Sequence, residues 1–277
     1  MEITFSQLDD TNARFLLAGC TMSFANSIRR AMIGEVQTLA IDEVKIYDNT
    51  SALFDEMLAH RLGLIPISGD EGCIVAREEC SCDGVGCPSC TVVLTMSVEG
   101  PGMVTSRDLI SEDPRIAPAD PDIPIVKLTK DQKLVLEARA LASCGREHAK
   151  WQPTTACGYK NYPVIIISEK CDACAQCVDE CPRNILEISK GRVAVTEGKL
   201  EACSLCKLCE RACLNTGIGE ESAIRIGTDE SRFLFVVESD GSLPAGRIVV
   251  KALEYLKSQS GELSAHLEEL SGVTENE

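Results

Sequence analysis

The N-terminal part of the chain shows two kinds of hydrophobic pattern. Two strand-like stretches, residues 3–8 and 13–18, flank four polar turn-forming residues, and this arrangement predicts a short β-hairpin. Apolar residues then recur every fourth position from Phe24 to Val36, a period typical of an amphipathic helix. Arg29 and Arg30 fall on a different face of that helix.

Further along, strand-like runs alternate with segments that interrupt regular structure. A second helix is predicted at residues 53–62, and Gly, Pro and Cys dominate residues 69–90, where we expect little regular structure. Prolines also mark residues 113–124 as irregular backbone. Strands are predicted at residues 38–47, 92–98, 133–137, 164–167, 223–226 and 233–237.

The C-terminal segment changes to a helical pattern that can begin at Pro244, since a proline at the first helical position sacrifices no hydrogen bond. The apolar positions that follow have 4-3 spacing, interrupted at Ser260: Val249, Leu253, Leu256, Leu263, Leu267 and Leu270. Such a seam fits against another helix, although periodicity alone equally allows it to pack inside its own domain. From Glu262 the chain carries acids and neither Lys nor Arg, so we expect a solvated, fraying end.

Composition is that of an ordinary globular protein. The chain has 277 residues, 44% of them hydrophobic and 25% charged, which excludes a mainly disordered chain and favours two domains, with room for one inserted into the other. The net charge of −16 leaves no basic footprint for direct sequence-specific binding of nucleic acid. No apolar run approaches the ~20 residues that span a bilayer, and no signal peptide is visible, so we expect a cytoplasmic protein without membrane contact.

Cysteine usage is the most unusual feature of the composition, with 16 cysteines in the chain. In a reducing compartment their usual role is metal binding rather than disulfide formation. Twelve of them fall into three clusters of four. The other four are expected to be ordinary small core or surface residues: Cys20, Cys73, Cys144 and Cys157.

Two of the clusters have the spacing C-x2-C-x2-C-x3-C of bacterial ferredoxins. They are Cys171, Cys174, Cys177 and Cys181, and Cys203, Cys206, Cys209 and Cys213. In this arrangement three thiolates of a loop bind one [4Fe-4S] cluster and the fourth serves the other cluster. The spacing therefore predicts two [4Fe-4S] clusters. Cluster one would be held by Cys171, Cys174, Cys177 and Cys213, and cluster two by Cys203, Cys206, Cys209 and Cys181.

The two runs differ at one position, because Pro182 follows the first run and Leu214 follows the second. This departure removes no ligand. Two tetrahedral zinc sites are the alternative, since zinc also accepts four cysteines, but zinc sites favour paired C-x2-C spacing over triplets. Apolar residues between the runs would shield the clusters from water. Spacing does not separate a cluster that carries electrons from one that staples the chain.

The third cluster lies earlier in the chain and suits a structural zinc site. It consists of Cys80, Cys82, Cys87 and Cys90. Gly84 and Gly86 allow the tight turns that bring four sulfurs onto a tetrahedron. Four protein ligands leave no open position for a substrate, so the expected role is structural. Free thiols on a loop are the alternative.

Motifs for catalysis are missing from the sequence. The three histidines, His60, His148 and His266, form no two-histidine metal motif and lie beside no evident nucleophile. The sequence contains neither a phosphate-binding P-loop nor a G-x-S-x-G or H-E-x-x-H motif. We therefore expect no catalysis by this chain alone.

Three segments resemble a known family. The stretch from Asn26 to Ile67, the His148-Ala149-Lys150-Trp151 motif and the run from Phe235 to Pro244 are similar to the alpha-like D subunit of archaeal DNA-directed RNA polymerase. That family includes the eukaryotic third-largest subunit and the N-terminal domain of the bacterial alpha subunit. The resemblance covers both ends and the middle of the chain.

The resemblance implies an α+β fold with a split alpha-like dimerisation domain. Residues 1–48 and 227–277 would form the dimerisation domain, and residues 49–163 an inserted domain with a zinc loop at 80–90. Residues 164–226 would form a ferredoxin-like iron-sulfur module. The family's zinc site corresponds to the Cys80 to Cys90 loop, although this chain has four residues in the middle gap where eukaryotic relatives usually have three.

The resemblance also implies partners. The C-terminal seam would pair with the smaller subunit L, and Arg29, Arg30 and the segment from Leu58 to Ile67 would dock the second-largest, catalytic subunit. Small zinc-binding subunits would join the same platform. We therefore predict a non-catalytic assembly subunit of a cytosolic archaeal RNA polymerase. The alternative is a ferredoxin-like electron-transfer protein that its alpha-like part docks on an oxidoreductase.

Overall fold

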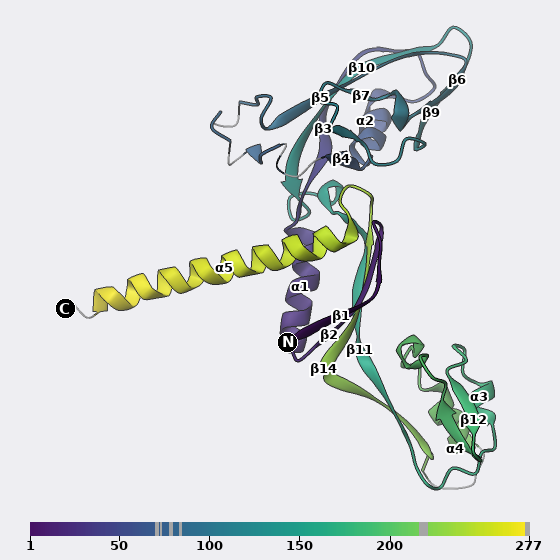
Figure 1. Cartoon of the computed structure of the whole chain (residues 1–277). Helices are drawn as coiled ribbons and strands as arrows, with labels where there is room; N and C mark the ends of the chain where they lie inside the picture. Colours follow the sequence, from purple (N-terminus) through teal and green to yellow (C-terminus); the bar gives the residue numbers. More distant parts are fainter. Residues whose placement is uncertain (70–71, 73, 78–79, 83–84, 216–220, 275–277) are drawn as a thin grey trace. The chain divides into compact units, whose positions relative to one another are not determined.

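The computed structural model describes the chain except for residues 70–71, 73, 78–79, 83–84, 216–220 and 275–277 (Figure 1). The chain forms two compact units. One consists of Met1–Phe5, Phe15–Ala25 and Tyr159–Phe235, and the other of Ser6–Arg14, Asn26–Gly158 and Val236–Glu277. Each unit is described by itself.

A four-stranded sheet has the strand order β1-β2-β14-β11. Its strands are β1 (Glu2–Leu8), β2 (Asn12–Ala18), β11 (Thr154–Ile167) and β14 (Ile224–Ser239). The predicted N-terminal hairpin is confirmed. Its turn is fixed by Asp9, whose Oδ1 accepts the backbone N–H groups of Thr11 at 3.0 Å and Asn12 at 2.7 Å. Such Asx turns offer the backbone a local partner where the ladder ends.

Strand structure was predicted at 223–226 and at 233–237, and the structure has both stretches in one continuous strand, β14. The polar residues between the two apolar runs stay in the strand. Arg232 lies over the ring of Tyr162 at 3.8 Å, a cation–π contact with strand β11. Further along, Phe233 and Phe235 are buried, and Phe235 stacks on Phe15 at 4.9 Å. Cross-strand contacts thus accompany the extended backbone on the C-terminal side of this polar segment.

The second unit contains a six-stranded sheet of order β7-β5-β10-β3-β4-β8. Its strands are β3 (Gln37–Asn49), β4 (Ile67–Gly69), β5 (Thr91–Glu99), β7 (Ile110–Ser111), β8 (Ile116–Pro118) and β10 (Lys133–Cys144). A separate two-stranded sheet pairs β6 (Gly102–Thr105) with β9 (Pro124–Leu128). The central strand β10 pairs antiparallel with both β3 and β5, with Leu136 opposite Ile46 and Met96. Strand β8 lies within residues 113–124, where irregular backbone was expected, and β9 begins at the last of these residues, Pro124.

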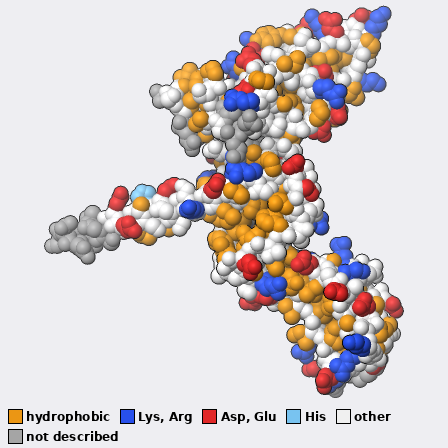
Figure 2. Space-filling view, viewed as in Figure 1, with side chains coloured by type: hydrophobic (Ala, Val, Ile, Leu, Met, Phe, Trp, Pro, Cys, Tyr) orange, Lys and Arg blue, Asp and Glu red, His pale blue; other side chains and the backbone are white. Residues whose placement is uncertain are grey.

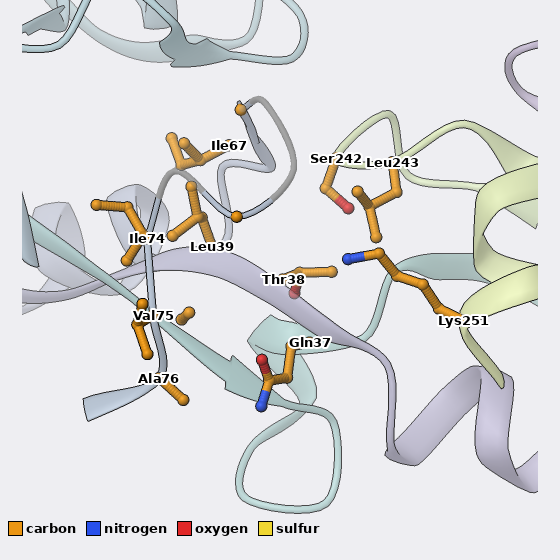
Figure 3. A pocket seen from close by; sticks show the side chains of 13 residues that line it. Gln37, Thr38, Leu39, Ile67, Ile74, Val75, Ala76, Ser242, Leu243 and Lys251 are labelled. Atoms are coloured by element: carbon orange, nitrogen blue, oxygen red, sulfur yellow. The ribbon is translucent and has the colours of Figure 1, made fainter. Parts of the chain in front are cut away.

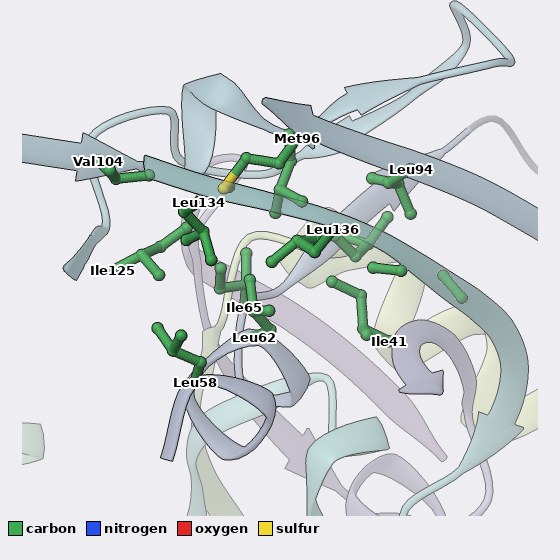
Figure 4. Packing of buried hydrophobic residues seen from close by; sticks show 14 of the residues in the cluster. Ile41, Leu58, Leu62, Ile65, Leu94, Met96, Val104, Ile125, Leu134 and Leu136 are labelled. Atoms are coloured by element: carbon green, nitrogen blue, oxygen red, sulfur yellow. The ribbon is translucent and has the colours of Figure 1, made fainter. Parts of the chain in front are cut away.

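One face of this sheet packs against helix α2 (Asp55–Gly63). Figure 4 shows Leu58 and Leu62 directed toward Ile41, Leu134 and Leu136 from the strands. All five side chains are buried, because alternate strand residues share a face and residues four apart share a helix face.

The predicted docking segment from Leu58 to Ile67 also has a role within this fold. Its apolar side chains Leu58, Leu62, Ile65 and Ile67 belong to this core. The apolar side chains that α2 and its C-terminal end leave exposed are Met57 and Leu64.

The His148-Ala149-Lys150-Trp151 motif ties strands β3 and β10 together. Trp151 donates its Nε1 hydrogen to the carbonyl of Leu141 at 3.1 Å, and its own carbonyl accepts the hydroxyl of Thr38 at 2.8 Å. Lys150 donates to the carbonyl of Ile41 at 3.2 Å and pairs with Asp42 at 2.5 Å. The bonds to β3 link residues more than a hundred positions apart, so the motif has a structural role here.

Two further helices are α1, which follows strand β2, and α5, which follows strand β14. Helix α1 spans Met22–Gly34, as the four-residue period predicted, and α5 spans Ala245–Thr274. Helix α5 continues beyond Glu262 to Thr274, and residues 262–270 are exposed, as expected for a solvated end. In the part of the chain that the structure describes, no helix combines the length and apolarity needed to cross a membrane.

The cysteine-rich segment from residue 168 to 223 forms a small module in the first unit. It contains α3 (Gln176–Asp179), the hairpin of β12 (Leu186–Ser189) and β13 (Arg192–Val195), and α4 (Leu208–Asn215). Its core combines five apolar side chains with four thiols. The apolar members are Ile185, Leu186, Val193, Ile224 and Ile226, and the thiols are Cys177, Cys181, Cys203 and Cys209.

Candidate metal centres

The two ferredoxin-type loops adopt the same backbone conformation. Ala173 and Ala175 in the first loop have φ of 58° and 68°, and the equivalent Leu205 and Lys207 in the second have φ of 58° and 60°. Non-glycine residues in the left-handed region are strained and persist where their surroundings determine them. The two loops thus repeat the same strained φ values at equivalent positions, which suits two similar binding sites.

The thiols of the two loops fall into two groups. Burial raises the pKa of the Cys177 thiol to about 11, and the next largest influences come from Cys213, Cys171 and Cys174, with Cys209 last.

A second group surrounds Cys209. Burial also raises the pKa of the Cys209 thiol to about 11. A hydrogen bond from the backbone of Glu210 opposes this, and smaller influences come from Cys181, Cys203 and Cys206. The structure thus places each loop's fourth cysteine, Cys213 or Cys181, beside the other loop's triplet.

A cavity marks the second group. Its lining includes all four of these thiols, Cys181, Cys203, Cys206 and Cys209, together with Ile185 and Ile226. Thiols and aliphatic side chains around one space suit a soft, sulfur-rich cofactor shielded from water.

The residues present fit iron-sulfur clusters better than single metal ions. Within the described residues, no three of these eight thiols come within 4.8 Å of one another. A tetrahedral zinc ion would hold all four sulfurs of a set at about 3.8 Å from each other, given zinc–sulfur bonds of about 2.3 Å. A four-iron cluster instead spreads its thiolates over four separate corners. Cys174 and Cys206, the second cysteine of each run, are exposed.

The missing proline of the second run has a structural counterpart. In the first run α3 ends at Asp179, before Cys181 and Pro182, whereas in the second run α4 continues through Cys213 to Asn215. Leu214 is compatible with a helix that continues, and a proline inside that helix would remove a hydrogen bond.

The third cluster has a different geometry. The sulfurs of Cys80 and Cys87 are 3.5 Å apart, those of Cys82 and Cys90 3.6 Å, and those of Cys87 and Cys90 3.9 Å. All four sulfurs lie within 4.8 Å of one another. These separations are close to the ~3.8 Å that a tetrahedral zinc ion imposes. Gly86, with φ of 92°, supplies a tight turn, and Gly84 lies outside the described residues.

The thiols of this cluster differ in pKa. A hydrogen bond from the backbone of Gly86, followed by the thiol of Cys80, lowers the pKa of Cys82 to about 6. The backbone of Cys82 lowers the pKa of Cys80, but the thiols of Cys82 and Cys87 outweigh it and raise that pKa to about 12. One thiolate is therefore available near neutral pH, and thiolates are the metal-binding form.

The leucine seam of α5 divides into two halves. Val249 is buried, and Leu253 and Leu256 are half-buried against the chain itself. Further along, the exposed fractions of Leu263, Leu267 and Leu270 are 61%, 57% and 66%. Every residue from Lys257 to Leu270 is exposed, and Figure 2 shows acidic side chains along this half. The inner half thus packs within the chain, while the outer half is exposed, and its pairing with another helix stays a prediction.

Arg29 and Arg30 line a cavity in the second unit together with Arg146, Tyr255 and Leu256. Arg29 donates to Oδ1 of Asn26 at 3.0 Å, and Arg30 is exposed. Arg146 forms an ion pair with Glu35. The cavity thus joins the basic residues of α1 to seam residue Leu256 of α5.

Another cavity lies between the ends of β3 and β10 and the start of α5 (Figure 3). Ile67, Ile74 and Leu243 contribute apolar walls, and Lys251 extends toward Thr38 and Ser242. Lys251 is the one ionisable side chain among the described lining residues. Sequence periodicity gave no signal for this cavity.

Lys160 is the functional candidate that sequence reasoning missed. It lies on β11, and its Nζ donates to the carbonyl oxygens of Glu201 at 2.6 Å and Cys203 at 2.7 Å. The partners are more than forty positions away, so no local pattern reveals them.

Comparisons with known proteins agree with this architecture. Residues 44–158 match the RNA polymerase Rpb3/RpoA insert domain, and residues 164–187 match a 4Fe-4S binding domain. These matches and the cysteine groups support iron-sulfur binding.

Three relatives that match along nearly their whole length are DNA-directed RNA polymerase subunits Rpo3. DNA-directed RNA polymerase subunit Rpo3 of Methanosarcina mazei is 50% identical over 271 residues, which cover 98% of this chain and 99% of that protein. The Rpo3 subunits of Methanosarcina acetivorans and Methanothermobacter thermautotrophicus are 48% and 44% identical, over 98% and 94% of this chain and 99% and 96% of their own lengths. The chain belongs to the family of archaeal DNA-directed RNA polymerase subunit Rpo3.

Proposed function

We propose that this chain is a non-catalytic assembly subunit of RNA polymerase that forms a heterodimer with subunit L through α5. The observation that carries this is the outer half of α5. It presents Leu263, Leu267 and Leu270 on one face, with more than half of each side chain exposed. A helix this exposed gains little from its own fold, and a 4-3 leucine seam favours a second helix as its cover.

The second-largest polymerase subunit would dock at Arg29 and Arg30, with the small zinc-binding subunits on the same platform. The position of both arginines at a cavity beside Leu256 supports this role. On α2 the docking contacts would come from the exposed Met57 and Leu64, since the neighbouring leucines are core residues. The catalytic chemistry would belong to the large subunits, in the cytoplasm.

The proposed organisation has three parts. Residues 1–48 and 227–277 form the dimerisation domain, 49–163 the inserted domain, and 164–226 the iron-sulfur module. The module would hold two [4Fe-4S] clusters, one on Cys171, Cys174, Cys177 and Cys213 and one on Cys203, Cys206, Cys209 and Cys181. When bound, each cluster would link two distant loops and could carry one electron. Zinc would occupy Cys80, Cys82, Cys87 and Cys90, a role that their sulfur separations support.

The seam is tested by the double variant Leu263→Asp, Leu267→Asp. Two buried carboxylates would prevent helix pairing, so we expect loss of subunit L in a pull-down with the full chain. Ala265→Asp is the matched control, since residue 265 is exposed on the opposite side of the helix, and it should retain subunit L. Retention of subunit L by the double variant would refute the proposed interface.

The alternative, an electron-transfer protein attached to an oxidoreductase, is the weaker hypothesis. The relatives match along nearly the whole chain rather than along the cysteine-rich module alone. Under the alternative, the double variant would bind its partner as the unchanged chain does.

A further inference from the structure

A cavity of about 450 Å³ in the second unit is lined by more cations than acids. Counted over all of its described lining residues, the charged side chains are Arg29, Arg30 and Arg146 against Glu35, a balance of +2. The whole chain carries a net charge of −16, so the cavity is a positive site on an acidic protein. Positive charge in a concave site with apolar walls favours anionic groups.

Two of these arginines have no acidic partner within the described residues. Arg29 donates from Nε and Nη2 to the amide oxygen of Asn26, at 3.3 and 3.0 Å, and this neutral partner leaves its charge uncompensated. Arg30 is exposed and forms no ion pair with the part of the chain that the structure describes. A planar guanidinium without an acidic partner is a donor that matches a carboxylate.

The third arginine reaches the cavity from the loop that follows β10. A Cβ at Gly145 would lie 2.2 Å from the carbonyl oxygen of Ile33 and 2.7 Å from Cγ of Gln152, so only glycine lets this loop come so close to the end of α1. The next backbone N–H, that of Arg146, donates to the carbonyl of Gly34 at 3.0 Å. This bond satisfies a carbonyl at the C-terminus of α1, where unpaired carbonyl groups would oppose an anion.

An internal carboxylate already binds in this cavity. Glu35, the residue that follows α1, forms an ion pair with Arg146. The side chain of Arg146 stays 62% exposed in this pair, whereas that of Glu35 is 20% exposed. A guanidinium has five N–H donors, so Arg146 can donate to a second carboxylate from the side that Glu35 leaves open.

We propose that this cavity binds a carboxylate side chain, Asp or Glu, of the second-largest polymerase subunit, held by Arg30 and Arg146 together. This inference deepens the docking role proposed above and rests on it. Arg146 is the added contact and Gly145 positions it, while the charge of Glu35 opposes the incoming carboxylate. Leu256 of the α5 seam lines the same cavity, so the docked group would lie beside the helix proposed to bind subunit L.

The test isolates polymerase through the tagged full-length chain in rising salt and quantifies the second-largest subunit relative to subunit L by mass spectrometry. Arg146→Met should weaken binding of the second-largest subunit about tenfold, since a charge-assisted hydrogen bond is lost. Subunit L should stay bound, because its proposed contact is on α5. Arg107→Met is the matched control: Arg107 also pairs with an acid, Asp122, and its side chain is 67% exposed. This control should retain both subunits to the same salt concentration as the unchanged chain.

A second variant separates a direct contact from a purely structural ion pair. Glu35→Gln keeps an amide oxygen that can accept from Arg146 but removes the opposing charge. The second-largest subunit should therefore be retained to higher salt than in the unchanged chain. Unchanged or weaker retention would mean that the pair only shapes the loop, and would overturn the inference. This result decides the question even if Arg146→Met fails to fold.

Arg30→Met distinguishes this inference from the docking role on which it rests. Loss of the second-largest subunit in Arg30→Met, with full retention in Arg146→Met, would overturn the inference and leave the docking role in place. Full retention in both variants would overturn both. Loss in both variants, with subunit L retained and higher salt resistance in Glu35→Gln, is the result that we expect.

Discussion

The six-stranded sheet and the iron-sulfur module differ in the kinds of residue that form their cores. The sheet packs hydrocarbon side chains from α2 and several strands, among them Leu58, Leu94 and Leu136. In the module, four of the nine buried core residues are cysteines. A hydrocarbon core is stabilised by burial alone, whereas thiols set around a cavity gain most of their stabilisation from the group they bind. The same chain thus combines a hydrocarbon core with a core rich in thiols, and we expect the second to depend on the cofactor it binds.

The backbone reinforces this difference. The module holds non-glycine residues in the left-handed region at Ala173, Ala175, Leu205 and Lys207. Each such conformation costs of order 1–3 kcal/mol, and a module with few apolar residues has little packing energy to offset it. Under the proposed assignment, cluster binding would supply stabilisation that offsets this strain.

Removal of iron should therefore give the largest effect of any perturbation. After anaerobic chelation we expect the module from residue 168 to 223 to unfold, while the six-stranded sheet keeps its structure. Hydrogen exchange with mass spectrometry checks this, with amides of β12, α3 and α4 becoming unprotected and those of β3, β5 and β10 staying slow. Protected module amides in an iron-free chain would abolish the distinction between the two regions.

A cavity in the core of the six-stranded sheet should give an intermediate effect, and this effect should be confined to that sheet. Leu58 is completely buried, so Leu58→Ala should lower the free energy of unfolding of this sheet by about 2–5 kcal/mol. Iron content should not change. The neighbouring Met57 is 51% exposed, and Met57→Ala, the matched control, should cost less than about 0.5 kcal/mol in denaturant unfolding. Equal losses from both variants would contradict the packing described for α2.

The Cys80 to Cys90 loop should give the smallest and most local effect, visible in its pH dependence. The hydrogen bond from Gly86 lowers the pKa of Cys82 from the ordinary 9.0 to about 6. The Cys82 thiolate therefore favours the folded loop fully above pH 9.0, and this contribution is lost as the pH falls through about 6. Zinc binding, which needs thiolates, should weaken as the pH falls.

Alkylation of the zinc-stripped chain, followed residue by residue with mass spectrometry, measures this titration. Cys82 should react with a midpoint near pH 6. Cys20 is the internal control, because burial raises the pKa of its thiol, and it should react only at more alkaline pH. A Cys82 midpoint near that of an ordinary cysteine would contradict the sulfur cluster's hydrogen bonding.

Elements with strong local patterns were predictable from sequence. The hairpin around Asp9 and helix α1 follow from turn residues and a four-residue period, and the cysteine loops follow from spacing. Strand β14 could not be predicted as one element, because the polar segment at 229–231 has the composition of a turn and only pairing across the sheet keeps it extended. The role of Lys160 likewise depends on carbonyl groups that folding brings to it.

The two halves of α5 show the same limit. The 4-3 pattern includes both Val249 and Leu263, yet one residue is buried in the chain and the other exposed. Spacing predicts that a face is apolar, but the neighbouring elements decide what covers it.

The central claim, that this chain serves polymerase assembly, is tested most directly by its native partners. The tagged chain would be purified anaerobically from its own cells, and the proteins that accompany it quantified by mass spectrometry. We predict subunit L and both large polymerase subunits in amounts equal to the tagged chain. Recovery of the chain alone, or with an oxidoreductase and no polymerase subunits, would contradict the account.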